Sequence, residues 1–235
     1  MSSVDYDRSG QLYSTYPQDV GRQLKKNRGK EKIMIKKLLG GLFKKEKIEE
    51  SNFIVATLND KIMPIDRGEI YEDTLDEILI AKNVGEVSGG GTMQEKSGEI
   101  SFCDVEIKLN GTEIDKTIIN HIIEKLESFG APKGSFLTIE KTQEKINFGQ
   151  LEGIGIYLDG LNLPKNVYEE CDINFVITEI HRLTETEYIV NRNWENETGT
   201  ALYFYGESFV KMRTQIKDFV ENYPLCENCR IEQIA

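Results

Sequence analysis

The chain has 235 residues, of which 39% are apolar, and its 29 basic and 40 acidic side chains give a net charge of −11. This length and composition suit one large or two small globular domains. The sequence has no apolar run of 18 or more residues and no N-terminal hydrophobic block before a cleavage site, so we expect a cytoplasmic protein without a membrane span. Its four cysteines are expected to be reduced thiols, because disulfide frameworks belong mainly to small secreted domains.

Charge is distributed unevenly along the chain. Residues 1–50 hold 12 basic and 7 acidic side chains, whereas the other 185 residues hold 17 and 33. A surface as acidic as that of the second part repels nucleic acid and attracts basic proteins by electrostatic steering. We therefore expect a basic protein partner and no nucleic acid, although solubility alone also accounts for an acidic surface.

Residues 1–33 are polar and have no sustained apolar period, which predicts a disordered arm. Residues 34–50 show a short helical pattern with lysines around it, interrupted by two central glycines. This basic amphipathic helix can make weak contact with a membrane surface through residues 34–47, dock in a partner's groove or pack on its own acidic domain. Met34, where the pattern begins, is also a candidate translation start. The apolar face consists of Ile35, Leu38, Leu39, Leu42 and Phe43.

The first patterned domain covers residues 51–141. We expect a strand at 53–58, a helix from about Glu72, and a strand at 99–109 in which apolar and polar residues alternate. A helix from about residue 112 and a strand at 136–139 follow, joined by a proline turn. With one further strand, the order β-α-β-β-α-β predicts a ferredoxin-like unit, in which two helices cover one side of an antiparallel sheet.

A polar link over residues 141–150 leads to a second domain, 151–235, in which the same pattern returns. The apolar stripe Ile118, Ile122, Leu126 and Phe129 matches Met212, Ile216, Val220 and Tyr223 after a shift of about 94 residues. Asp172 is a good N-cap for a helix of this second unit. The sequence therefore predicts an α+β protein that is a tandem repeat of two ferredoxin-like units. Its other strands are expected at 154–158, 187–193, 200–206 and 231–234.

Two motifs resemble known chemical sites, but each lacks residues that such a site needs. The run Gly89-Gly90-Gly91-Thr92 lacks the Lys-Ser/Thr of a phosphate-binding loop, so we expect a flexible hairpin or a β-bulge there. Cys226 and Cys229 have the spacing of half a zinc site, which needs four ligands. The other possible ligands are Cys103, Cys171, His121 and His181, and none follows the pattern of a metal site or a catalytic triad. We therefore expect no metal, no cofactor and no catalytic residue.

Outward carboxylates and tyrosines form the candidate binding surface. Asp104 and Glu106 point the same way from one strand, and Asp159 lies outward on another, so these carboxylates could also hold a catalytic metal. Aromatic side chains beside carboxylates suit protein recognition, because they supply contact area while the charges steer the partner. The alternative is that the tyrosines are buried where the two repeats pack. The aromatic candidates are Tyr157, Trp194, Tyr203 and Tyr205.

Several short motifs between residues 50 and 235 resemble those of a widespread group of uncharacterised acidic bacterial proteins. Some small acidic proteins of this general appearance are immunity proteins beside polymorphic toxins. Residues 4–12 are also similar to the YD repeats of Rhs-type toxins. The resemblance implies a bacterial context and no active site. Its motifs are Gly85–Thr92, Cys103-Asp104, Gly130–Ser135, Gly153–Gly160, Thr200–Gly206 and Tyr223-Pro224-Leu225.

The leading hypothesis is a non-enzymatic protein-binding module, an immunity or antitoxin-like protein that neutralises a basic effector through an acidic, tyrosine-bearing surface. A second hypothesis is a regulatory protein that binds a small molecule at the interface of the repeats. A third is a metal-dependent enzyme that uses Asp104, Glu106 and Asp159.

Overall fold

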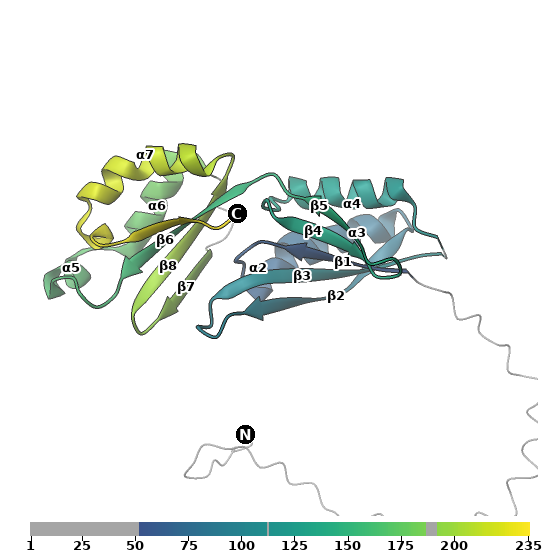
Figure 1. Ribbon diagram of the computed structural model, residues 1–235, viewed down its shortest axis with the longest axis horizontal. Coiled ribbons are helices and arrows are strands. Elements are labelled where there is room, and N and C mark those ends of the chain that lie inside the picture. The colour runs from purple at the N-terminus through teal and green to yellow at the C-terminus, as the bar shows by residue number, and fades with distance from the viewer. Residues whose placement is uncertain (1–51, 112, 187–191) are drawn as a thin grey trace, which may run out of the picture. The chain divides into compact units, whose positions relative to one another are not determined.

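The computed structural model describes residues 52–111, 113–186 and 192–235 (Figure 1). These residues form a five-stranded and a four-stranded antiparallel sheet, and both sheets belong to one compact unit. The predicted disordered arm at 1–33 and the predicted basic helix at 34–50 lie outside the described residues. Within the described part of the chain, no helix is long and apolar enough to cross a membrane.

The first repeat contains the five-stranded sheet, whose strand order is β2-β3-β1-β4-β5. Its first four strands and its helices follow the order β-α-β-β-α-β, so the predicted ferredoxin-like unit is present. The first helical segment begins earlier than expected, because Pro64 occupies the first position of a helix rather than a loop. The elements are β1 (Asn52–Leu58), α2 (Pro64–Arg67), a π-helical turn (Gly68–Glu72), α3 (Asp73–Ala81), β2 (Gly85–Gln94), β3 (Ile100–Leu109), α4 (Lys116–Ser128), β4 (Ser135–Ile139) and β5 (Glu144–Phe148).

The core of this repeat lies between the sheet and its helices. Alternation in β3 buries Cys103, Val105 and Ile107 and leaves the polar residues between them on the other face, as predicted. In α4 the buried stripe includes Ile119, whereas the predicted Ile118 is only partly buried at the edge of the core. The face of the sheet opposite the helices is therefore open and carries the polar residues of β3.

The glycine-rich segment is part of β2 and contains a β-bulge. Pairing of β2 with β3 shifts register between Val87 and Gly89, which confirms the bulge interpretation. A Cβ on Gly90 would lie 2.6 Å from the Asp104 carbonyl oxygen, so a side chain would clash with the neighbouring strand. The glycine at this position allows close strand approach and is unrelated to phosphate binding.

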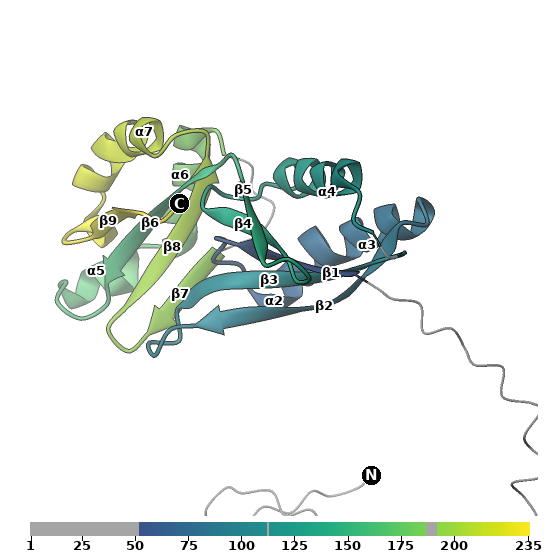
Figure 2. The same ribbon diagram turned by 45° about the vertical axis from the view of Figure 1, so that its right-hand side comes forward.

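The second repeat contains the four-stranded sheet in the order β7-β8-β6-β9, again ferredoxin-like (Figure 2). Helices α6 and α7 pack together on this sheet, and Asp172 caps α6 by accepting a hydrogen bond from the Asn174 amide, as predicted. Of the strand expected at 187–193, residues 187–191 lie outside the described part. The elements are β6 (Glu152–Asp159), α5 (Lys165–Glu170), α6 (Ile173–Thr184), β7 (Arg192–Asn196), β8 (Gly199–Gly206), α7 (Phe209–Asn222), a 3₁₀ turn (Pro224–Cys226) and β9 (Arg230–Gln233).

The segment at 141–150, expected to be a polar link, differs from that expectation. It contains β5, which pairs with β4 and extends the first sheet. Phe148 is buried in the core and Ile146 packs against it, whereas the polar residues of β5 are exposed. Gly149 then turns the chain with a φ of +101°, and a Cβ there would lie only 1.9 Å from the Pro132 carbonyl oxygen. The connection between the repeats is thus a short, constrained turn.

Candidate ligand-binding site

A buried ion pair joins the two repeats. Asp60, in the loop after β1, has no exposed surface, and Arg192 at the start of β7 donates from Nε and Nη2 to its two carboxylate oxygens at 2.7 and 3.0 Å. The Tyr71 hydroxyl donates to the same carboxylate at 2.8 Å. A buried carboxylate needs such partners, because its desolvation costs several kcal/mol.

A second polar cluster surrounds Glu99 in the turn between β2 and β3. Its carboxylate forms an ion pair with Lys61 at 2.9 Å and accepts hydrogen bonds from the hydroxyls of Tyr203 and Tyr157 at 2.8 and 3.1 Å. Burial raises the pKa of Glu99, but the hydrogen bonds from Lys61 and Tyr203 outweigh it and hold this pKa below its ordinary value. The Lys61 amide also donates to the Tyr205 hydroxyl at 3.0 Å. Both clusters connect the first repeat to the second.

These contacts correct the predicted exposure of the tyrosines. Tyr203 is only 4% exposed, while Tyr157 and Tyr205 are partly buried, and all three hydroxyls bond to the first repeat. Leu202 and Phe204 do turn inward, as expected, but the opposite face of β8 is covered by the first repeat instead of solvent. Of the two interpretations, burial between the repeats is therefore the one the structure confirms. These tyrosines do not form a free surface for a protein partner.

The other predicted binding residues are not brought together in one site. Asp104 accepts a hydrogen bond from Thr57 at 2.6 Å and Glu106 is exposed, both on the open face of the first sheet. Asp159 accepts from the Leu161 and Asn162 amides and so shapes a turn in the second repeat. The Trp194 indole nitrogen lies 3.6 Å from where a Cβ on Gly98 would be, next to the first repeat.

The cysteines and carboxylates provide no metal centre in the described residues, where no group of three or more metal-ligating side chains gathers. Cys103 is fully buried in the first core, as expected. Cys226 is buried in the second core, and this burial raises the pKa of its thiol to about 12, so the thiol stays protonated at neutral pH.

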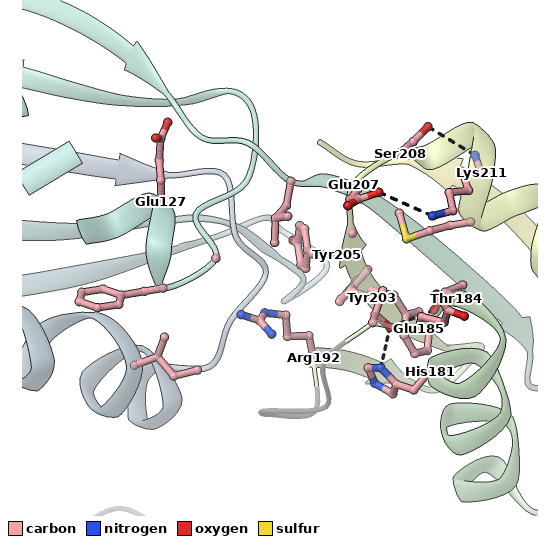
Figure 3. Close-up of a pocket in the computed structure, with 18 of the residues that line it drawn as sticks. Glu127, His181, Thr184, Glu185, Arg192, Tyr203, Tyr205, Glu207, Ser208 and Lys211 are labelled. Atoms are coloured by element: carbon pink, nitrogen blue, oxygen red, sulfur yellow. Dashed lines mark hydrogen bonds and ion pairs between the residues drawn. The ribbon is translucent and has the colours of Figure 1, made fainter. Parts of the chain in front are cut away.

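A cavity of about 670 Å³ lies beside the polar contacts, with walls from both repeats (Figure 3). The first repeat contributes Glu69, Ile70, Thr74 and the end of α4, and the second contributes the end of α6, the beginning of α7 and strand β8. Arg192, Tyr203 and Tyr205 belong at once to the interface and to the cavity wall. The second hypothesis from the sequence placed a small molecule at the repeat interface, but it named neither Arg192 nor the helix ends.

The wall of this cavity combines apolar and polar groups. Its main apolar side chains are Phe129, Leu151, Phe204 and Met212. The His181 ring lies edge-on to Phe204 and forms a 2.8 Å hydrogen bond with Thr186, and burial lowers the pKa of His181. The imidazole is therefore neutral at neutral pH. Such a mixture suits binding and orientation of a small molecule better than it suits proton transfer.

Comparisons with known proteins add no functional assignment. No protein-family model matches the chain, and no curated protein matches it. Two solved structures show limited likeness: an unknown protein from Galdieria sulphuraria and the first two RRM domains of the yeast poly(U)-binding protein Pub1. The first is 12% identical over 78% of this chain and 98% of its own, with a TM-score of 0.24. The second is 10% identical over 77% and 99%, with a TM-score of 0.22, and neither likeness supports an argument about function.

The Asp60–Arg192 pair yields a stability prediction. Arg192→Met leaves the buried carboxylate without its cation, which lowers the free energy of unfolding by about 3–5 kcal/mol. Adding Asp60→Asn removes the unpaired charge and keeps an acceptor for Tyr71, so the double variant is expected to recover much of the loss. Urea unfolding measures the free energy of unfolding of both variants. A double variant less stable than Arg192→Met would contradict the role of the ion pair.

The Glu99 cluster yields a pH prediction. A carboxylate whose folded pKa is depressed stabilises the protein above its unfolded pKa, and this contribution disappears as pH falls through the folded pKa. Replacing Glu99 with Gln is expected to cost about 1.5–3 kcal/mol at neutral pH, the range for hydrogen bonds to charged groups. The difference in free energy of unfolding between the two proteins should shrink as the pH falls below 4.5, the ordinary pKa of a glutamate side chain. Unfolding of both proteins across the acid range tests this, and a constant difference would refute it.

Proposed function

We propose that this protein binds a small organic molecule in the cavity between its two ferredoxin-like repeats and acts as a regulatory binding protein without catalysis. The observation that supports this proposal is the cavity itself, about 670 Å³ in volume and walled by both repeats. Small-molecule sites typically measure about 300–1,000 Å³ and combine an apolar lining with a few polar groups.

The polar interface supports a binding role for a second reason. Arg192, Tyr203 and Tyr205 are fixed by hydrogen bonds to the first repeat, so the wall they form is ordered before a ligand arrives. Preorganisation of this kind lowers the entropic cost of binding. A ligand that touches both repeats also stabilises their packing, which suits a regulatory protein.

Thermal unfolding with a library of small molecules tests this function. Compounds that bind the cavity raise the melting temperature, since a ligand at about 100 times its Kd adds about 2.7 kcal/mol of stability. Ser128→Trp places a large ring at the exposed end of α4, where Ser128 lines the cavity, and should abolish the shift. Glu124→Trp, one turn earlier on the same helix and outside this cavity, is the matched control.

Two results would contradict the proposed function. The first is a library in which no compound stabilises the wild-type protein. The second is a set of stabilising compounds that act equally on wild type and Ser128→Trp, because these compounds would bind elsewhere.

A second candidate function is binding of a basic protein, such as a bacterial toxin, as the immunity hypothesis suggests. One observation favours it: the open face of the first sheet places exposed Glu106 near Phe53, which is 37% exposed. On this face Phe53 lies opposite Lys108, and Val55 lies opposite Glu106. An exposed carboxylate close to an exposed aromatic ring is suited to a basic partner.

Capture from a bacterial lysate at low and moderate salt tests this second candidate. Glu106→Lys reverses the charge of one exposed side chain and should release a basic partner at moderate salt, where wild type retains it. Glu144→Lys, an exposed change on β5, controls for net charge. Capture of no specific protein at either salt concentration, or equal capture by wild type and both variants, would count against this function.

A further inference from the structure

We infer that the ligand of the cavity between the repeats is an organic cation with an apolar body, such as an arylalkylamine. This assignment rests on the proposed function and specifies the chemistry of the same site. It depends on three independent features of the wall: its charge, its hydrogen-bonding groups and its aromatic and apolar surface.

The charge of the wall favours a cation. Arg192 is already neutralised by the fully buried Asp60 carboxylate. The Lys211 ammonium forms an ion pair with the Glu207 carboxylate, marked in Figure 3, so its charge is also partly offset. The two groups are 3.6 Å apart. The other three wall carboxylates, Glu69, Glu127 and Glu185, form no ion pair with a described residue. An anionic ligand would be repelled by these carboxylates, whereas a cation is attracted by them.

The hydrogen-bonding groups favour a ligand that donates. Tyr203 gives its hydroxyl proton to Glu99, and Thr184 gives its proton to the Ile180 carbonyl, so both hydrogens are used within the protein. By contrast, Gln215 Oε1 exposes less than 1 Å² and has no hydrogen-bond partner within the described part of the chain. A buried acceptor without a partner is unfavourable, because it has lost its hydrogen bonds to water. The terminal torsion of glutamine is broad, so a rotation can bring this oxygen to a ligand N–H group.

The aromatic and apolar side chains of the wall suit the apolar body of the ligand. The Tyr205 ring already contacts the Arg192 guanidinium at 5.2 Å, and the Tyr203 ring contacts the Lys61 ammonium at 5.3 Å. These faces satisfy the protein's own cations, so the cationic head is assigned to the wall carboxylates and Gln215 and not to these rings. The apolar side chains Phe129, Leu151 and Met212 line the same cavity and suit a hydrocarbon body. A cationic head and an apolar body therefore match different parts of one wall.

A matched series of three probes tests the inference with the full chain. Phenylbutylamine, phenylbutanol and phenylbutyrate share an aromatic ring and a similar chain length but carry positive, neutral and negative heads at neutral pH. Isothermal titration at low salt is expected to show that the amine binds at least about tenfold more tightly than the alcohol, with the carboxylate weakest. Loss of amine binding in Ser128→Trp, but not in Glu124→Trp, places the site in the cavity.

Two variants of Gln215 sharpen the test. Gln215→Leu removes the unpaired acceptor and should weaken amine binding at least fivefold, about the effect of one hydrogen bond. Alcohol binding should weaken less, because the hydrogen bond of an ammonium group is charge-assisted and that of a hydroxyl is not. Gln215→Glu adds a carboxylate and should strengthen amine binding. Thr214→Val, on the adjacent position of α7 and outside this cavity, is the control.

The failures of the two proposals are distinguishable. Alcohol or carboxylate binding as tight as amine binding, and lost in Ser128→Trp, overturns the cationic assignment and leaves the proposed function intact. Weaker amine binding in Gln215→Glu also overturns it. If none of the three probes binds, the compounds that stabilise the protein in the thermal-unfolding library test the assignment by their charge. Stabilising compounds that are neutral or anionic would overturn it. A library without any stabilising compound overturns the proposed function itself.

Discussion

The buried pair of Asp60 and Arg192 is the constraint on which the arrangement of the two repeats depends. Its members are 132 residues apart, one after the first strand of the first sheet and the other at the start of β7. A carboxylate with no exposed surface cannot remain unpaired without a large loss of stability. The pair is satisfied only when both repeats are folded and packed, so it couples the two sheets and fixes Arg192 in the cavity wall.

The elements that the sequence predicted well are those set by local pattern. Alternation in β3 and the capping residue Asp172 depend on neighbours in the chain, and the structure confirms both. Whether the tyrosines of β8 are exposed depends instead on what covers the sheet. A usable signal was present: residues Ala201 to Phe204 are apolar or aromatic without alternation, which is typical of a strand covered on both faces, and all four are buried. Arg192 had no such signal, because its partner is distant in sequence.

The polar character of the interface helps to explain why a cavity persists beside it. An apolar interface tends to close up, since every void loses dispersion contacts and exposes apolar surface. Hydrogen bonds and ion pairs are directional, and they hold their partners at set distances without filling the volume next to them. The bonds from Tyr203 and Tyr157 to Glu99, and from Lys61 to Tyr205, therefore fix the walls while they leave space between α4 and α7.

Ligand binding in the cavity depends on the packing of both repeats. Because the cavity has walls from both repeats, a molecule that fills it binds only the packed form and not an isolated repeat. The short turn at Gly149 keeps the repeats close even when they separate, so the entropic cost of repacking is small. Under the proposed function, a ligand in the cavity therefore stabilises the packed form by an amount set by its concentration relative to its Kd. Under the proposed function, the tyrosine-lined interface, rather than a free surface, is the element on which ligand binding acts.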